Sequence, residues 1–247
     1  MFGHPALTAA FLFASGFAVQ EAAKDSDEEA KAKIAEFRKE LKNCKTDQDV
    51  ARALQALGET QHPKILAELK TWLSKPSLDV AVAAAEQISK YKKDKEASDA
   101  LLGAAGSRKD KDAIVKCLRY AGDVGYKPAV TKLTGYFKHR EVDVAREAVD
   151  SCGKLRSRDA VDPLIGLLRE LEGIRESQPG TGGGGGLGGL VGGGGLGGVQ
   201  EEQQKRKRDL TPAVLSALSH ITGQKFETSA EWTGWWRKNK STFKEPE

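Results

Sequence analysis

Small apolar side chains recur at helical spacing in four segments along the middle of the chain. Each segment begins with an aspartate, and the four starts are Asp49, Asp79, Asp112 and Asp143. Successive starts lie 30, 33 and 31 residues apart. A period of this size is typical of helical repeat proteins, in which each repeat is one supersecondary unit. The pattern therefore predicts one helix with small apolar residues in every repeat.

A second kind of helix, with larger apolar residues, is predicted between these segments. It is expected over residues 63–73, 128–137 and 159–171. No stretch alternates apolar and polar residues with period two over a useful length, so no sheet is expected. A repeated helical hairpin buries its faces only by stacking against neighbouring hairpins. We therefore expect an all-α protein, an α-solenoid of about five helical hairpins with a C-terminal capping helix.

Two neighbouring segments resemble a known repeat family. Residues 144–155 read VAREAVDSCGKL, and residues 159–168 read DAVDPLIGLL. This pair resembles the short HEAT-type repeat, in the version also found in phycobilisome-lyase-like proteins, and the resemblance extends over residues 47–171. It implies a helical solenoid. It leaves the activity open, because the family contains scaffolds, adaptors and a few enzymes.

An uncharged stretch at residues 6–19 is rich in Ala, Leu and Phe. Its length suits the apolar core of a signal peptide and is too short for a membrane span. We expect residues 1–20 to be a signal peptide cut after Ala18, and the protein to be exported, either periplasmic or secreted. The start lacks the usual Lys or Arg, so an apolar tail on a cytosolic protein stays open as the alternative.

The repeat pattern is predicted to fill residues 26–172 and then to be interrupted. Residues 180–198 contain 14 glycines in 19 positions. Glycine loses the most conformational entropy on ordering and offers no side chain to pack. Residues 173–208 are therefore expected to form a Gly-rich disordered insertion within the last hairpin. Residues 209–247 are expected to hold the last solenoid helix, with its small-residue segment starting at Thr211, and a Trp-rich capping helix.

Three tryptophans, Trp232, Trp235 and Trp236, lie within one predicted helix near the C-terminus. Their spacing of three and four residues places them on one apolar stripe. A solenoid end needs a cover over its last hairpin, so a lid is the main interpretation. An aromatic platform for a ligand stays open. The pattern Ile-Thr-Gly-x-x-Phe at 221–226, followed by Trp-x-x-Trp-Trp, resembles the tails of exported bacterial HEAT-repeat proteins.

Charged residues of alternating sign recur at fixed positions after each repeat aspartate. The seventh following position holds Glu86, Arg119 and Asp150, and the eleventh holds Lys90, Asp123 and Lys154. Helices packed about 8–10 Å apart bring long side chains within reach of one another, so a network of ion pairs is expected across the second helices. These helices line the concave side in HEAT solenoids, and a charge-balanced face argues against a groove for a polyanion. The candidate interaction surface comprises these charges and the three tryptophans: Glu86, Lys90, Arg119, Asp123, Asp150, Lys154, Trp232, Trp235 and Trp236.

No catalytic, cofactor or metal site is predicted. The four histidines are scattered, and the sequence has neither a His-x-x-x-His pair nor a Cys-x-x-Cys pair. It also lacks a phosphate-binding loop of the Walker type and a Gly-x-Ser-x-Gly elbow. Cys117 and Cys152 fall at apolar positions of helices, which favours buried thiols over ligands. We therefore expect a protein that is not an enzyme and needs no cofactor.

The expected function is that of a monomeric, non-catalytic scaffold or adaptor that binds another protein. The alternative is binding of an anionic polymer, either nucleic acid or a cell-surface polysaccharide, through basic loops and the Trp/Lys-rich end. Nucleic acid is disfavoured because 39 basic and 35 acidic residues leave a net charge of only +4. The basic residues behind this alternative are Lys90, Lys92, Lys93 and Lys95, the run at 205–208, and residues 232–240.

Overall fold

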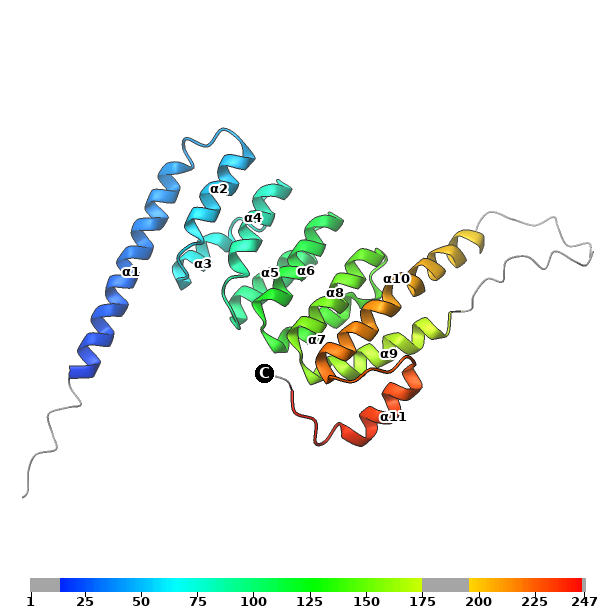
Figure 1. Cartoon of the computed structure of the whole chain (residues 1–247). Helices are drawn as coiled ribbons and strands as arrows, with labels where there is room; N and C mark the ends of the chain where they lie inside the picture. Colours follow the sequence, from blue (N-terminus) through cyan, green and yellow to red (C-terminus); the bar gives the residue numbers. More distant parts are fainter. Residues whose placement is uncertain (1–13, 175–195, 246–247) are drawn as a thin grey trace, which may run out of the picture. The chain divides into compact units, whose positions relative to one another are not determined.

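The computed structural model describes residues 14–174 and 196–245, with side chains over 26–174 and 199–245. Every regular element within these stretches is a helix, and none is a strand (Figure 1). The chain divides into two compact units, residues 1–90 and 91–247. The prediction of an all-α solenoid of stacked hairpins is confirmed. Residues 1–13 of the predicted signal peptide and residues 175–195 of the predicted insertion lie outside the described residues.

The first unit holds two helical hairpins. Helix α1 pairs with α2, helix α3 pairs with α4, and the second helices α2 and α4 lie against each other. Leu54, Ile65 and Ile88 are fully buried among these helices. The bounds are α1 Ala14–Glu40, α2 Asp47–Leu57, α3 Pro63–Lys70 and α4 Leu78–Ile88.

Local sequence explains where the helices of the first unit begin. The Thr46 side chain accepts a hydrogen bond from the Asp49 amide, and the Asp49 side chain accepts one from the Thr46 amide, which forms a capping box for α2. Pro63 occupies the first turn of α3, where its missing N–H costs nothing. Helix α1 already begins at Ala14, so the signal cleavage site predicted after Ala18 falls within a helix.

The second unit holds three hairpins and a capping helix. Its second helices α6, α8 and α10 lie side by side, and α5, α7 and α9 pack behind them (Figure 1). Helix α7 is flanked by the short 3-10 helices η1 and η2, and η3 precedes α9. The bounds are α5 Lys95–Ser107, α6 Lys111–Val124, η1 Lys127–Ala129, α7 Val130–Leu133, η2 Thr134–Lys138, α8 Val142–Leu155, η3 Arg158–Ala160, α9 Val161–Glu172, α10 Leu196–Thr222 and α11 Ser229–Asn239.

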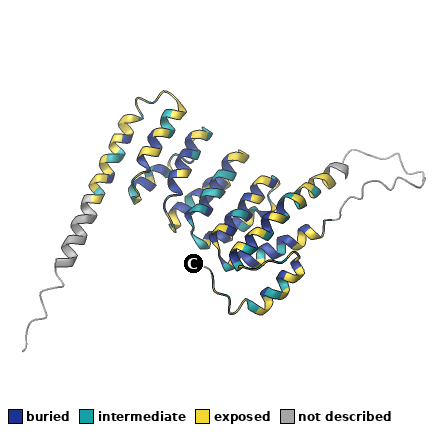
Figure 2. Ribbon diagram, viewed as in Figure 1, coloured by how far each residue is buried: buried dark blue, intermediate teal, exposed yellow. Residues whose placement is uncertain are grey.

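Small residues let the second helices approach one another closely. A Cβ atom placed on Gly122 of α6 would lie 3.0 Å from the Cα of Ser151 on α8. One placed on Gly153 of α8 would lie 3.1 Å from the Cα of Ala217 on α10. The Ser151 hydroxyl donates a buried hydrogen bond of 2.9 Å to the Leu118 carbonyl oxygen. The small-residue pattern thus fixes both the distance and the register between these helices, and Figure 2 shows the buried positions along their facing sides.

The first helices differ in two places from the prediction. The helix predicted over 128–137 is broken into η1, α7 and η2. It contains Gly135, which has a low helix propensity. In addition, α5 was not predicted as a separate helix, because its apolar positions are mostly alanines such as Ala97 and Ala105. Lys95, expected in a basic loop, is the first residue of α5.

The predicted C-terminal boundary of the insertion, residue 208, is wrong, because the last helix of the last hairpin begins earlier. Helix α10 begins at Leu196, so residues 196–208 are helical and do not belong to a disordered segment. Glycines end at Gly198, and the following run of Glu, Gln, Lys and Arg consists of strong helix formers. The Arg206 guanidinium donates to the carbonyl oxygens of Phe137 and His139, which end η2. Arg206 therefore ties this polar part of α10 to the preceding hairpin.

Replacing Arg206 with methionine is expected to lower the free energy of unfolding by about 1–2 kcal/mol, because hydrogen bonds to charged groups are worth about 1.5–3 kcal/mol and Arg206 is only half-buried. Urea denaturation measures the change. The control is Arg208→Met, which removes an exposed guanidinium that forms an ion pair with the neighbouring Asp209. An equal effect of both changes would contradict the anchoring role of Arg206.

No helix in the described part of the chain is long and apolar enough to cross a lipid bilayer.

Candidate functional site

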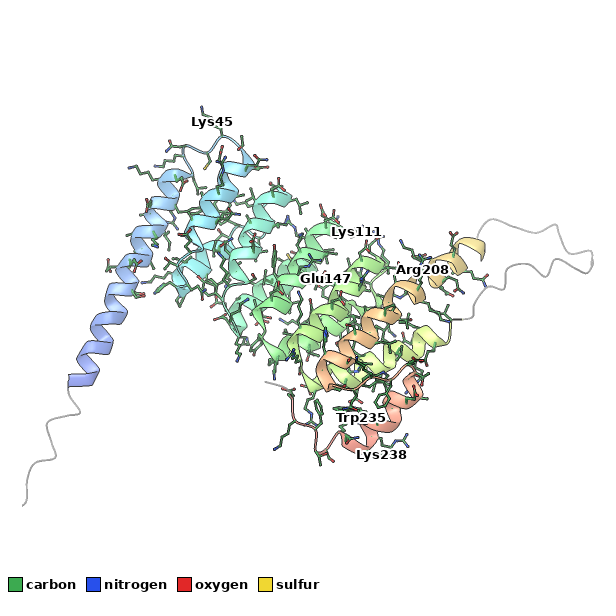
Figure 3. All side chains as sticks on the ribbon, viewed as in Figure 1. Lys45, Lys111, Glu147, Arg208, Trp235 and Lys238 are labelled. Atoms are coloured by element: carbon green, nitrogen blue, oxygen red, sulfur yellow. The ribbon has the colours of Figure 1, made fainter. Side chains whose placement is uncertain are left out.

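The second helices of the second unit share an open face with a hollow in it. The hollow measures about 340 Å³ and receives side chains from α6, α8 and α10. Figure 3 shows Glu147 on the middle helix, α8, of this row. We call this hollow the second-helix groove, and its lining comprises Arg119, Glu147, Asp150, Gly153, Lys154, Ser216, Ala217 and His220.

One ion pair across the groove is bidentate and joins a buried carboxylate to a half-exposed guanidinium. The Arg119 Nη2 lies 2.7 Å from Glu147 Oε2, and Arg119 Nε lies 3.2 Å from both carboxylate oxygens. Glu147 is only 7% exposed, and its hydrogen bond raises the pKa of the Arg119 guanidinium. Fork-shaped pairs of this kind fix geometry as well as charge. Arg119 is therefore held rigidly at the α6 side of the groove.

A second ion pair joins α6 and α8 near their C-terminal ends. Lys154 Nζ lies 2.7 Å from Asp123 Oδ1. The Asp123 carbonyl oxygen also accepts a hydrogen bond of 2.8 Å from Lys92. This pair is half-exposed, so it contributes a fraction of a kcal/mol to stability at most, roughly 0.2–1. The sequence-based expectation that Asp123 and Lys154 meet between neighbouring helices agrees with this geometry.

Asp150 does not have the ion-pair partner on α6 that the charge pattern predicts. The closest ion pair of Asp150 among the described residues is with Arg146, at 3.9 Å between Nε and Oδ2. Burial, followed by the charge of Glu147, raises the pKa of the Asp150 carboxyl. The expected pairing of Arg119 with Asp150 is therefore not formed, because Arg119 reaches Glu147, one helical turn earlier.

Family comparisons match two stretches of the chain, which include the groove residues on α6 and α8 but not those on α10. A model of HEAT repeats matches residues 34–119, and a model of the PBS lyase HEAT-like repeat matches residues 144–170. Residues 34–119 and 144–170 therefore belong to the HEAT-repeat family. A search among curated proteins gives no match for this HEAT-repeat protein. Among solved structures it is similar to a de novo designed 16-helix transmembrane nanopore, with 15% sequence identity and a TM-score of 0.17. That match covers 90% of the HEAT-repeat chain and 62% of the designed chain.

The tryptophans of the HEAT-repeat protein form the cover of its last hairpin. Trp232 is fully buried and Trp236 is 4% exposed, and α11 packs on α9. The Trp236 Nε1 donates to the Asp162 carboxylate on α9 at 3.0 Å. Trp235, labelled in Figure 3, is half-buried and stacks against Trp236 with ring centroids 6.0 Å apart. This arrangement favours the lid interpretation and places none of the three tryptophans in the second-helix groove.

The last residues of the chain add further contacts to this cover. Glu245 accepts hydrogen bonds of 2.7 Å from the Lys127 side chain and from the Arg158 amide. Lys240 Nζ lies 2.8 Å from Asp162 Oδ2. These contacts connect residues more than 70 positions apart, so no local sequence pattern predicts them.

The remaining predicted site residues, Glu86 and Lys90, belong to the first unit. Glu86 lies exposed on α4, and the Lys90 ammonium donates to the side-chain oxygen of Gln87. Sequence reasoning missed the groove residues Glu147, Ser216 and His220. Glu147 lies one turn before Asp150 on the same face of the helix, and this position could have indicated that it lines the groove. Ser216 and His220 follow the insertion, where the regular period could not be extended.

The cysteines and histidines give no indication of a reactive centre. Burial raises the pKa of the Cys117 thiol to about 11, and burial also raises the pKa of the Cys152 thiol. Thiols of this kind stay protonated and are poor nucleophiles at neutral pH. Within residues 14–174 and 196–245, no group of three or more His, Cys, Asp or Glu side chains is placed to hold a metal ion.

A larger hollow of about 890 Å³ lies between α9 and the start of α10. Its lining includes Leu167, Ile174, Arg206 and the exposed Val199. Ile174 borders residues 175–195, which the structure does not describe.

Proposed function

We propose that this HEAT-repeat protein is a non-catalytic scaffold or adaptor that binds another protein through its second-helix groove. The observation that carries the proposal is the open row of α6, α8 and α10, which offers a hollow lined from three helices. HEAT repeats generally mediate protein–protein interaction or scaffolding. The rigid Arg119–Glu147 pair and the small residues of the floor give this face a fixed shape for a partner.

The proposal includes export of the protein from the cytoplasm. Its support is the uncharged run at residues 6–19 and the abrupt change to charged residues from Glu21 onward. The mass of the mature protein isolated from its own cells tests this part. Removal of the first 18 residues would support export, and an intact Met1 in the mature protein would contradict it.

The anionic-polymer alternative has lost part of its support. It relied on the basic run at 205–208, but Arg206 and Lys207 donate to the backbone carbonyl oxygens of His139 and Ile174, which follow η2 and α9. Lys92 likewise donates to the Asp123 carbonyl oxygen. These three cations form hydrogen bonds within the protein, so protein binding is better supported than binding of an anionic polymer.

Affinity capture tests the proposed role. The full mature chain is used as bait on an envelope extract, beside a Ser216→Trp variant that fills the groove from an exposed position. We expect a defined protein to be captured by the parent chain and lost with Ser216→Trp. The matched control is Thr131→Trp, which adds the same side chain at an exposed position on α7. Capture that is equal for both variants, or absent for the parent chain, would contradict the proposal.

A further inference from the structure

The second-helix groove contains two cations that are already paired and one carboxylate that is not paired closely. Arg119 is held at 2.7 Å by Glu147, and Lys154 is held at 2.7 Å by Asp123. Asp150 lies between these pairs along α8, and its recorded ion pair with Arg146 is 3.9 Å long. Of the two carboxylates that line the groove, Asp150 therefore has the longer ion pair, 3.9 Å against 2.7 Å for Glu147.

We propose that Asp150 receives a lysine or arginine side chain of the partner protein, which extends the binding role proposed above by naming the chemistry that the groove recognises. The partner's cation would complete an alternating row of charges across α6, α8 and α10. An arginine would do so through two parallel N–H···O bonds, since its planar fork matches a carboxylate.

The groups facing Asp150 are consistent with this occupant. Glu147, Arg146 and Lys154 are its charged neighbours on α8, Arg119 faces it from α6, and His220 lines the same hollow from α10. Burial and the Glu147 charge both raise the pKa of the Asp150 carboxyl. Both effects disfavour the ionised form of Asp150, and an incoming cation would offset that cost.

The shape of the groove also fits a single long basic side chain. At about 340 Å³ it lies at the lower end of the usual range for small-ligand sites. Gly153 and Ala217 form a floor without long side chains, and the exposed Ser216 and His220 stand at the rim. The apolar stem of a lysine or arginine can lie along such a floor while its charged end reaches the carboxylate.

Other occupants fit the groove less well. An anionic side chain would meet the carboxylates of Glu147 and Asp150 while Arg119 and Lys154 are already engaged. An apolar side chain would remove water from the Asp150 carboxylate without replacing its hydrogen bonds, and burying an unpaired charge is costly.

Selection of phage-displayed random peptides against the folded full chain tests the proposal. The selected peptides are then titrated against the parent chain, Asp150→Asn, Asp143→Asn and Ser216→Trp. Asp143→Asn is the matched control, because Asp143 lies on the same helix and its side chain is 63% exposed. Asp150→Asn keeps the size of the side chain and removes the poorly solvated charge, so its melting temperature should equal or exceed that of the parent chain.

We expect the selected peptides to share a lysine or arginine at one position. Their affinity should fall about tenfold or more with Asp150→Asn, because the partner's cation is left without its counter-charge, and should stay unchanged with Asp143→Asn. Two outcomes would overturn the Asp150 proposal but leave the groove as a binding site. In the first, Ser216→Trp blocks the selected peptides, but the peptides share no basic residue. In the second, Ser216→Trp blocks them, but they bind Asp150→Asn as tightly as the parent chain. Failure to select any peptide that Ser216→Trp blocks would count against the groove as a binding site and so overturn both proposals.

Discussion

Replacing Trp232 with alanine is expected to lower the free energy of unfolding of the second unit by about 3–5 kcal/mol. Trp232 is fully buried, and its ring meets the ring of Phe226 edge-on at 4.9 Å. Its Nε1 donates to the Phe226 carbonyl oxygen at 3.2 Å. The substitution would remove both the buried apolar surface and this hydrogen bond.

Urea denaturation measures this loss, and hydrogen exchange of the amides in α9 and α11 locates it. The control is Trp235→Ala, which truncates the same kind of side chain three residues later. Trp235 is half-buried, so a clearly smaller loss is expected. Equal losses for the two variants would show that the buried lid does not depend on Trp232 and would weaken the lid interpretation.

Replacing Gly122 with alanine is expected to destabilise the second unit by about 1–3 kcal/mol, even though alanine favours a helix more than glycine does. The new Cβ would lie 2.9 Å from Ser151 Cβ and 3.0 Å from Ser151 Cα. Contacts this short force α6 and α8 apart. That movement would also disturb the hydrogen bond between the Ser151 hydroxyl and the Leu118 carbonyl oxygen.

Gly103→Ala is the matched control for this prediction. Gly103 lies inside α5, is exposed and would place its Cβ in open space. Here the same change should stabilise the protein by about 0.5–1 kcal/mol, because only the backbone entropy of the unfolded chain is affected. Thermal denaturation of both variants gives the comparison. A stabilising effect of Gly122→Ala would contradict the close approach of α6 and α8.

The charge network shows how far a sequence pattern can go in predicting contacts. The repeat period pairs residue 123 with residue 154, and those two side chains do meet. The same period pairs Arg119 with Asp150, but Arg119 binds Glu147 instead. Helical side chains lean toward the N-terminus, so a long arginine can reach the preceding turn of its neighbour. Side-chain length and direction, which the period does not contain, decided between the two carboxylates.

In the last hairpin, the sequence pattern failed to predict part of a helix. The glycine tract hid the start of α10, because the polar run from Gln200 to Arg208 lacks the apolar stripe that marked the other second helices. What stabilises this run is the bond of Arg206 to the end of η2, almost 70 residues away in the sequence. Such a contact has no local signature.

The sequence by itself determined the helical repeat, its family, and the cover of three tryptophans, since these depend on the spacing of apolar residues and recur locally. Only the tertiary structure decided which charges meet, where the last helix begins, and that Asp150 is left without a close partner on a face lined by three helices. These features depend on the distance and register between neighbouring helices. That register is set by packing at positions such as Gly122 and Gly153, where one added methyl group would change it.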